Sequence, residues 1–241
     1  MRQPGRPRST ALVGLAGLSM AALALTGCGP SVGINPGSAA VVGDRSLSMG
    51  TIDSTTDLYC EAYGPVIKQQ APDGIPMRYF RQVVTANLTE RLLGEQLAAE
   101  YDVQPASQYA AQVANLRQQF ASASSSARNA GIEVDGGDAY LKTVQVSIGR
   151  KLLAESGQTN PSLKAAFERG QVATQDWLKD HDVKVDPSLG VGFDKATGVA
   201  SFQRDSTSYP LSPLASQGAA NPTSAPDASY TSALPPSQVC S

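Results

Sequence analysis

Apolar and polar positions alternate at helical spacing through most of the chain between residues 48 and 181. Apolar residues three or four positions apart share one face of a helix, so such stripes predict amphipathic helices. We expect five helices on this basis, over residues 48–69, 77–101, 106–129, 138–155 and 160–181. The second has the most regular stripe, formed by Phe80, Val84, Leu88, Leu92 and Leu97. Isolated helices are marginal in water, so these stripes are expected to pack on one another.

Several helix ends are marked by residues that cap or break helices. Ser48 is suited to cap the first helix, and Asn160 followed by Pro161 is suited to begin the fifth. Residues 71–76 and 131–137 are rich in Pro, Gly and Asp, and both stretches are expected to be loops.

Short β-type patterns flank the helical region. Residues 39–44 and 183–187 predict two strands that pair and bring the ends of the domain together, and residues 191–202 predict a small hairpin or extended arm. The predicted fold class is therefore mainly α, with about five amphipathic helices and two or three short strands in a domain over residues 39–213. Residues 214–241 are rich in Ser, Pro and Ala, and we expect them to form a disordered tail.

The first 27 residues have the three parts of a secretory signal peptide. Three arginines precede an apolar run of about 15 residues, which is shorter than the roughly 20 residues of a membrane span. Leu25-Thr26-Gly27-Cys28 resembles the lipobox of bacterial lipoproteins. That resemblance implies cleavage before Cys28, a diacylglyceryl thioether on Cys28 and anchoring at the outer face of the bacterial cell membrane, with 28–38 as a flexible tether. The alternative is an ordinary signal peptide with a chance cysteine.

Composition narrows the classes of function. Removing the signal peptide leaves 214 of 241 residues and 16 Lys and Arg against 21 acids, a net charge of −5. A mildly acidic chain without a basic run argues against nucleic-acid binding. Cys60 and Cys240 are the remaining cysteines, and an even pair outside the membrane predicts a disulfide. The alternative is two free or intermolecular thiols.

No residue pattern predicts catalysis, a cofactor, a metal or a small-molecule substrate. The single histidine, His181, excludes most His-based metal sites and catalytic triads. The acidic residues do not have the spacing of a calcium loop. They form two groups, Asp180, Asp182, Asp186 and Asp194, and Glu133, Asp135 and Asp138, the second interpreted as a polar loop and a helix cap. Neither a Gly-x-Ser-x-Gly elbow nor a Ser-x-x-Lys motif occurs, so we expect a protein that is not an enzyme.

The aromatic residues allow two interpretations. Trp177, Phe167, Phe120, Phe80 and the tyrosines are expected to fill the core. The alternative is that part of this set lines an apolar groove for extended polypeptides, with a polar rim that maintains solubility.

The order of these parts resembles the SurA/PrsA N-terminal family of extracytoplasmic chaperones. The resemblance rests on the segments AAVVGDRSLSMGTID, from Ala39, and VKVDPSLGVGFDKATG, from Val183, with amphipathic helices between them. Ser188-Leu189 stands where that family usually has Arg-Tyr, and Phe193 where it has Trp. The chain has no room for the parvulin-type isomerase domain with which the family usually pairs this domain.

This resemblance implies a lipid-anchored protein that binds unfolded or extended exported polypeptides without catalysis. The alternative on the same scaffold is a dedicated binding or assembly partner of one cell-envelope protein.

Overall fold

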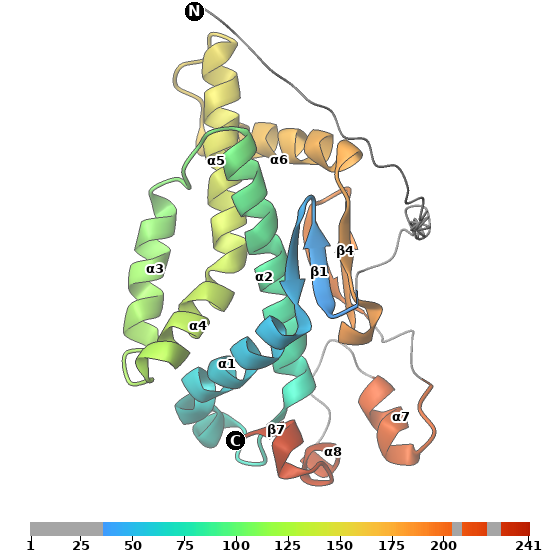
Figure 1. Cartoon of the computed structure of the whole chain (residues 1–241). Coiled ribbons are helices and arrows are strands. Elements are labelled where there is room, and N and C mark those ends of the chain that lie inside the picture. Colours follow the sequence, from blue (N-terminus) through green and yellow to red (C-terminus); the bar gives the residue numbers. More distant parts are fainter. Residues whose placement is uncertain (1–35, 204–208, 221–227) are drawn as a thin grey trace, which may run out of the picture. The chain divides into compact units, whose positions relative to one another are not determined.

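The computed structural model describes residues 36–203, 209–220 and 228–241 (Figure 1). The predicted mainly helical class is confirmed, since these residues form eight α-helices and seven short strands. The predicted signal peptide, Cys28 and most of the tether lie outside the described residues. Six helices form the body of the domain: α1 Met49–Gln70, α2 Met77–Glu100, α3 Gln108–Gln119, α4 Ser125–Asp135, α5 Gly137–Glu155 and α6 Leu163–Asp180.

Helix α2 contributes to both large apolar clusters of the domain. Its C-terminal half packs on α5 and α6 in a cluster that we call the α5–α6 cluster, which includes Leu93, Leu97, Ile148 and Trp177. Its N-terminal half packs with α1 in a second cluster, the groove cluster, whose buried members are Ala39, Ile52, Tyr59, Ile67, Phe80, Val84, Leu88, Val134, Leu189 and Cys240. The boundary between the clusters falls between Leu88 and Leu92, one helical turn apart.

The two predicted outlying strands do pair. Strand β1 (Ser38–Val42) lies between β2 (Arg45–Ser48) and β4 (Val183–Val185) in an antiparallel sheet, with Ala40 opposite Val185. The predicted hairpin also forms, from β5 (Val191–Asp194) and β6 (Val199–Phe202), after the short 3₁₀ helix η1 (Pro187–Leu189). The sequence does not predict strand β2, because its four residues lack an alternating apolar pattern. It ends at Ser48, whose hydroxyl caps α1 as predicted, accepting from the Thr51 backbone N–H at 2.9 Å.

The predicted helix over 106–129 is wrong, because two helices, α3 and α4, occupy this region. The chain turns after Phe120, whose ring is 1% exposed, and Ser124 then caps α4 by accepting from the Ala127 N–H at 3.2 Å. Arg128 donates to three carbonyl oxygens of this turn at 3.0–3.1 Å. Serine favours a cap over a helix interior because its side chain competes for backbone groups, which explains the break.

Two further boundaries differ from the prediction. The expected loop 131–137 is mostly helix, since α4 continues to Asp135 and α5 begins at Gly137. Gly137 permits the close contact of α5 with α2, because a Cβ on Gly137 would lie 2.2 Å from the Asn87 carbonyl oxygen. The last long helix, α6, begins at Leu163 with Ser162 as its cap, two residues after the predicted Asn160 and Pro161.

The prediction of a disordered tail over 214–241 is wrong for the residues described there. They form α7 (Pro213–Ala220), α8 (Ala228–Ser232), the 3₁₀ helix η2 (Pro236–Gln238) and strand β7 (Val239–Cys240). Strand β7 pairs antiparallel with β3 (Ile75–Pro76), next to α1 (Figure 1). The prediction of disorder from composition failed here, because backbone pairing and a disulfide hold a segment that has few apolar side chains of its own.

Candidate functional site

A groove of about 430 Å³ lies between the second half of α1 and the start of α2. Its walls include four aromatic rings, and the remaining lining is aliphatic apart from one amide. None of the described residues that line it is charged. The aromatic members are Tyr59, Tyr63, Tyr79 and Phe80, and Val66 on its rim is 42% exposed. Such a concave, uncharged surface suits apolar ligands.

The rings of the groove pack edge to face. The Tyr59 ring centroid lies 4.9 Å from that of Tyr63 and 5.5 Å from that of Phe80. Tyr63 also contacts Phe120, with centroids 5.3 Å apart. Edge-to-face pairs add about 0.5–1.5 kcal/mol each beyond the burial of their area. The floor is therefore a connected aromatic layer rather than a set of independent side chains.

The carboxylate of Asp135 accepts hydrogen bonds from two tyrosines of this layer and holds their rings in place. The Tyr59 hydroxyl donates to Asp135 Oδ1 at 2.5 Å, and the Tyr63 hydroxyl donates to Oδ2 at 2.6 Å. Burial and the neighbouring carboxylate raise the pKa of Tyr63 to about 12, and they raise the pKa of Tyr59 further. Burial also raises the pKa of Asp135 above its ordinary value, although both hydrogen bonds oppose that rise. At neutral pH both tyrosines are neutral donors, and their hydroxyls are engaged by Asp135.

No pattern in the sequence predicts this contact directly. The sequence analysis predicts a loop at Asp135, but this residue is the last of α4 and is half-buried. Tyr59 and Tyr63 are four residues apart on α1, so both hydroxyls can reach one acceptor. That spacing is the one signal in the sequence, but the partner is more than 70 residues away.

The C-terminal segment joins the two walls of the groove. The sulfurs of Cys60 and Cys240 lie 1.99 Å apart, the distance of a disulfide bond, and Cys60 follows Tyr59 on α1. Cys240 is 0% exposed and also pairs with Ile75, a groove residue that precedes α2. Gly74 has φ +79°, and a Cβ there would lie 2.3 Å from Val239. Glycine is therefore required where β7 crosses the turn.

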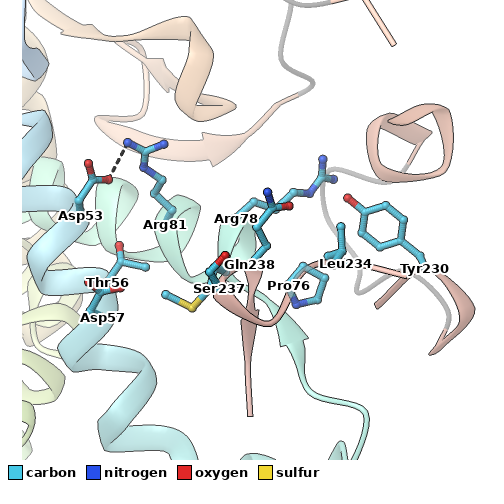
Figure 2. Close-up of a pocket in the computed structure, with 11 residues that line it drawn as sticks. Asp53, Thr56, Asp57, Pro76, Arg78, Arg81, Tyr230, Leu234, Ser237 and Gln238 are labelled. Atoms are coloured by element: carbon cyan, nitrogen blue, oxygen red, sulfur yellow. Dashed lines mark ion pairs between the residues drawn. The ribbon is translucent and has the colours of Figure 1, made fainter. Parts of the chain in front are cut away.

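A second cavity, of about 310 Å³, is lined by Pro76 of β3 and by residues of α1, α2 and the C-terminal segment (Figure 2). Figure 2 shows α1 and α2 lining one part of it and the C-terminal residues Tyr230, Leu234 and Gln238 another. Arg81 and Asp53 form an ion pair of 2.6 Å across its α1–α2 wall. Both side chains are substantially exposed, so the pair contributes little to stability. The cavity therefore lies where the C-terminal segment packs against α1 and α2.

His181 and three of the acidic candidates make structural contacts. His181 stacks on Trp177 with ring centroids 3.9 Å apart, and Asp182 pairs with Lys195 at 2.8 Å. Asp186 caps η1, and Asp194 accepts from the Ala196 N–H at 2.8 Å in the hairpin turn. Within the described ranges, no three His, Cys, Asp or Glu side chains are placed to hold a metal ion.

Glu90 is a buried carboxyl that the sequence did not single out. It lies on α2, is 4% exposed and accepts a hydrogen bond from the Ala200 N–H of β6 at 2.8 Å. Burial raises the pKa of Glu90 to about 7, with Asp138 raising it and Lys142 lowering it. The contact joins the hairpin to α2 and is far too enclosed to serve as a site for an extended ligand.

The aromatic set is divided between core and groove. Trp177, Phe120 and Phe80 are buried, as predicted for core residues, and Phe167 is half-buried. Phe80 also lines the groove, so the two interpretations of this set are compatible at that residue.

Comparison with known proteins gives no assignment: no family model, no curated protein and no solved structure matches the chain. In the part of the chain that the structure describes, no helix has both the length and the apolarity needed to cross a membrane.

Proposed function

We propose that this protein is a lipid-anchored, extracytoplasmic chaperone-like protein that binds extended apolar segments of exported polypeptides. The aromatic groove carries the proposal, because its uncharged lining offers contact to apolar side chains without requiring a particular sequence. The leader with Cys28 and the resemblance to the SurA/PrsA N-terminal family support an extracytoplasmic location. Binding here needs neither covalent chemistry nor a cofactor.

A specific feature favours the alternative of one dedicated envelope partner. The Tyr59 and Tyr63 rings are fixed by Asp135, and promiscuous binders generally use surfaces that repack around different ligands. A groove of about 430 Å³ with a fixed floor suits a few residues of a preferred segment. Generic chaperone activity therefore predicts binding of many unrelated polypeptides, whereas selective partner binding predicts binding of one envelope protein.

Replacing Val66 by Lys tests the groove. Val66 lies on its rim and is 42% exposed, so the change places a charge at the groove without opening the core. We expect Val66→Lys to reduce suppression of aggregation of a reduced, unfolded protein at least about tenfold, because an ammonium at the rim disfavours apolar contact. Val172→Lys on α6 is the matched control, since Val172 is 46% exposed and does not line the groove.

Equal activity of wild type and Val66→Lys would exclude the groove as the binding site. Activity against one envelope protein, with none against generic unfolded proteins, would establish the dedicated-partner alternative instead.

A further inference from the structure

The most exposed large apolar side chains of the described residues belong to one short segment. Tyr209 is 88% exposed and Leu211 is 93% exposed, on either side of Pro210. Scattered apolar residues on a surface are ordinary, but these two flank one proline and lie in a single exposed segment. The segment continues to Pro213, so Pro210-Leu211-Ser212-Pro213 has the P-x-x-P spacing.

The sequence of this segment favours an extended backbone. A residue that precedes proline is restricted to β or polyproline II conformations, and Tyr209 and Ser212 both precede one. The structure gives residues 209–211 neither helix nor strand, and α7 begins only at Pro213. An extended P-x-x-P segment loses little conformational entropy on binding, and aromatic-lined grooves are the surfaces that recognise it.

The segment and the aromatic groove match in chemistry. Residues 209–220 contain no charged side chain, and the described lining of the groove contains none either. The groove contains three tyrosine rings and Phe80, which offer flat apolar surface to proline and to the Tyr209 ring. Neither partner has to desolvate a charge, so burial of apolar surface is not offset by that cost.

Within one molecule the segment is not seated in the groove, as the exposure of Tyr209 and Leu211 shows. Helix α7, which follows the segment, packs on α8, where a Cβ on Gly218 would lie 2.4 Å from the Tyr230 hydroxyl. This tight contact fixes the C-terminal end of the segment. A groove and a matching ligand that are both exposed on the same chain are available to a second copy.

We propose that two copies of this chain associate by seating Tyr209, Pro210 and Leu211 of one copy in the aromatic groove of the other. The inference rests on the groove of the proposed function and makes the segment a competitor of the client. If each copy seats its segment in the groove of the other copy, the dimer is closed. If only one segment is seated, one groove of the dimer remains free. The contact is small, so association is weak, with Kd on the order of 100 µM.

Sedimentation velocity of the purified protein over a range of concentrations tests this association. We expect wild type to associate, and we expect Tyr209→Ser/Leu211→Ser and Val66→Lys each to weaken association at least about tenfold. Val172→Lys is expected to associate like wild type. Circular dichroism melting of each variant separates loss of association from loss of folding.

Mixing the two defective variants gives the decisive observation. Val66→Lys keeps an intact segment, and Tyr209→Ser/Leu211→Ser keeps an intact groove, so the mixture restores one contact and forms a heterodimer. A mixture that stays monomeric, or wild type that stays monomeric at every concentration, overturns the proposal. Protection of Tyr209 from solvent that does not depend on protein concentration also overturns the proposal, because it would place the segment in the groove of its own molecule.

The same samples distinguish this inference from the proposed function. Wild type that stays monomeric but suppresses aggregation through the groove retains the proposed function and refutes self-association. Wild type that associates as described but has no activity on unfolded polypeptides or on an envelope partner refutes the proposed function alone.

Discussion

The α5–α6 cluster and the groove cluster are built from different side chains and held by different means. The α5–α6 cluster is mostly aliphatic, and most of its buried residues come from the long helices α2, α5 and α6, with Val42 and Val183 added from strands. The groove cluster includes Tyr59, Phe80 and Cys240, and two polar contacts behind it end on Asp135. One is a packed interior, and the other is a packed layer with one face open to a groove.

The difference lies in what each cluster needs from distant parts of the chain. Helices α5 and α6 follow each other and pack closely, partly because Gly149 and Gly170 let their backbones approach. The groove cluster needs α4 and the last residues of the chain, and Cys60 and Cys240 are 180 residues apart. A layer with one face open to a groove packs against fewer neighbouring side chains. In the groove cluster, the disulfide and the hydrogen bonds to Asp135 supply additional contacts from distant parts of the chain.

The largest expected effect is loss of a side chain from the α5–α6 cluster. Leu93 is 0% exposed, and Leu93→Ala is expected to cost about 4 kcal/mol, because it removes apolar contacts and leaves a cavity. Urea denaturation measures the cost. At a temperature where the variant stays folded, groove binding should be unchanged, and a parallel loss of affinity would show that the clusters are not separable.

The next effect is loss of the disulfide. Cys60→Ala/Cys240→Ala is expected to cost about 3 kcal/mol of stability, because the bond closes a very long loop. Hydrogen exchange should accelerate at β3, β7 and the end of α1 and remain slow in α5 and α6. Uniform acceleration across all helices would mean that the bond supports the whole domain rather than the groove.

A pH-dependent effect is expected at Glu90, on α2 between the two clusters. Its pKa is about 7 in the folded protein and near 4.5 in the unfolded chain, so the folded state binds the proton more tightly. Stability therefore falls as pH rises from about 4.5 to above 7. Glu90→Gln removes this penalty and is expected to stabilise the protein by about 3 kcal/mol at pH 8 and by almost nothing at pH 4.

Urea titrations of wild type and Glu90→Gln at both pH values measure that difference. The glutamine oxygen still accepts from the Ala200 N–H, so the hairpin contact is kept. Equal effects at both pH values would show that the carboxyl does not titrate between them.

The sequence predicted the parts of this protein that depend on local pattern. The stripes of α1, α2 and α5, the Ser48 cap and the pairing of β1 with β4 follow from spacing and residue type. The sequence analysis does not predict the break between α3 and α4, where Ser124 caps α4 and Arg128 donates to carbonyl oxygens that precede it.

The sequence predicts the groove only as an alternative interpretation of the aromatic residues. Its geometry depends on Asp135 and Cys240, whose partners are far away in sequence. Composition also misled at the C-terminus, where a segment poor in apolar residues is held by Cys240 and by pairing with β3. Periodicity reports which face of a helix is buried, and it does not report which distant residue completes a site.

The smallest predicted effect on stability, and the most specific to the groove, belongs to Asp135→Asn. The amide keeps one acceptor oxygen but presents an N–H₂ donor to the second tyrosine hydroxyl, which must rotate to accept. The hydrogen bond to Asp135 loses its charge, so we expect a loss of about 1 kcal/mol. Near-ultraviolet circular dichroism should change, because Tyr59 and Tyr63 are no longer held in one orientation.

Asp138→Asn is the matched control for Asp135→Asn, three residues along the chain. Its carboxylate pairs with Lys142 at 2.7 Å on a largely exposed surface, where an ion pair contributes little. Affinity for an apolar peptide should fall in Asp135→Asn and stay constant in Asp138→Asn. If Asp135→Asn instead broadens the range of peptides bound, a fixed floor limits the ligands of this groove, which supports the dedicated-partner alternative over generic chaperone activity.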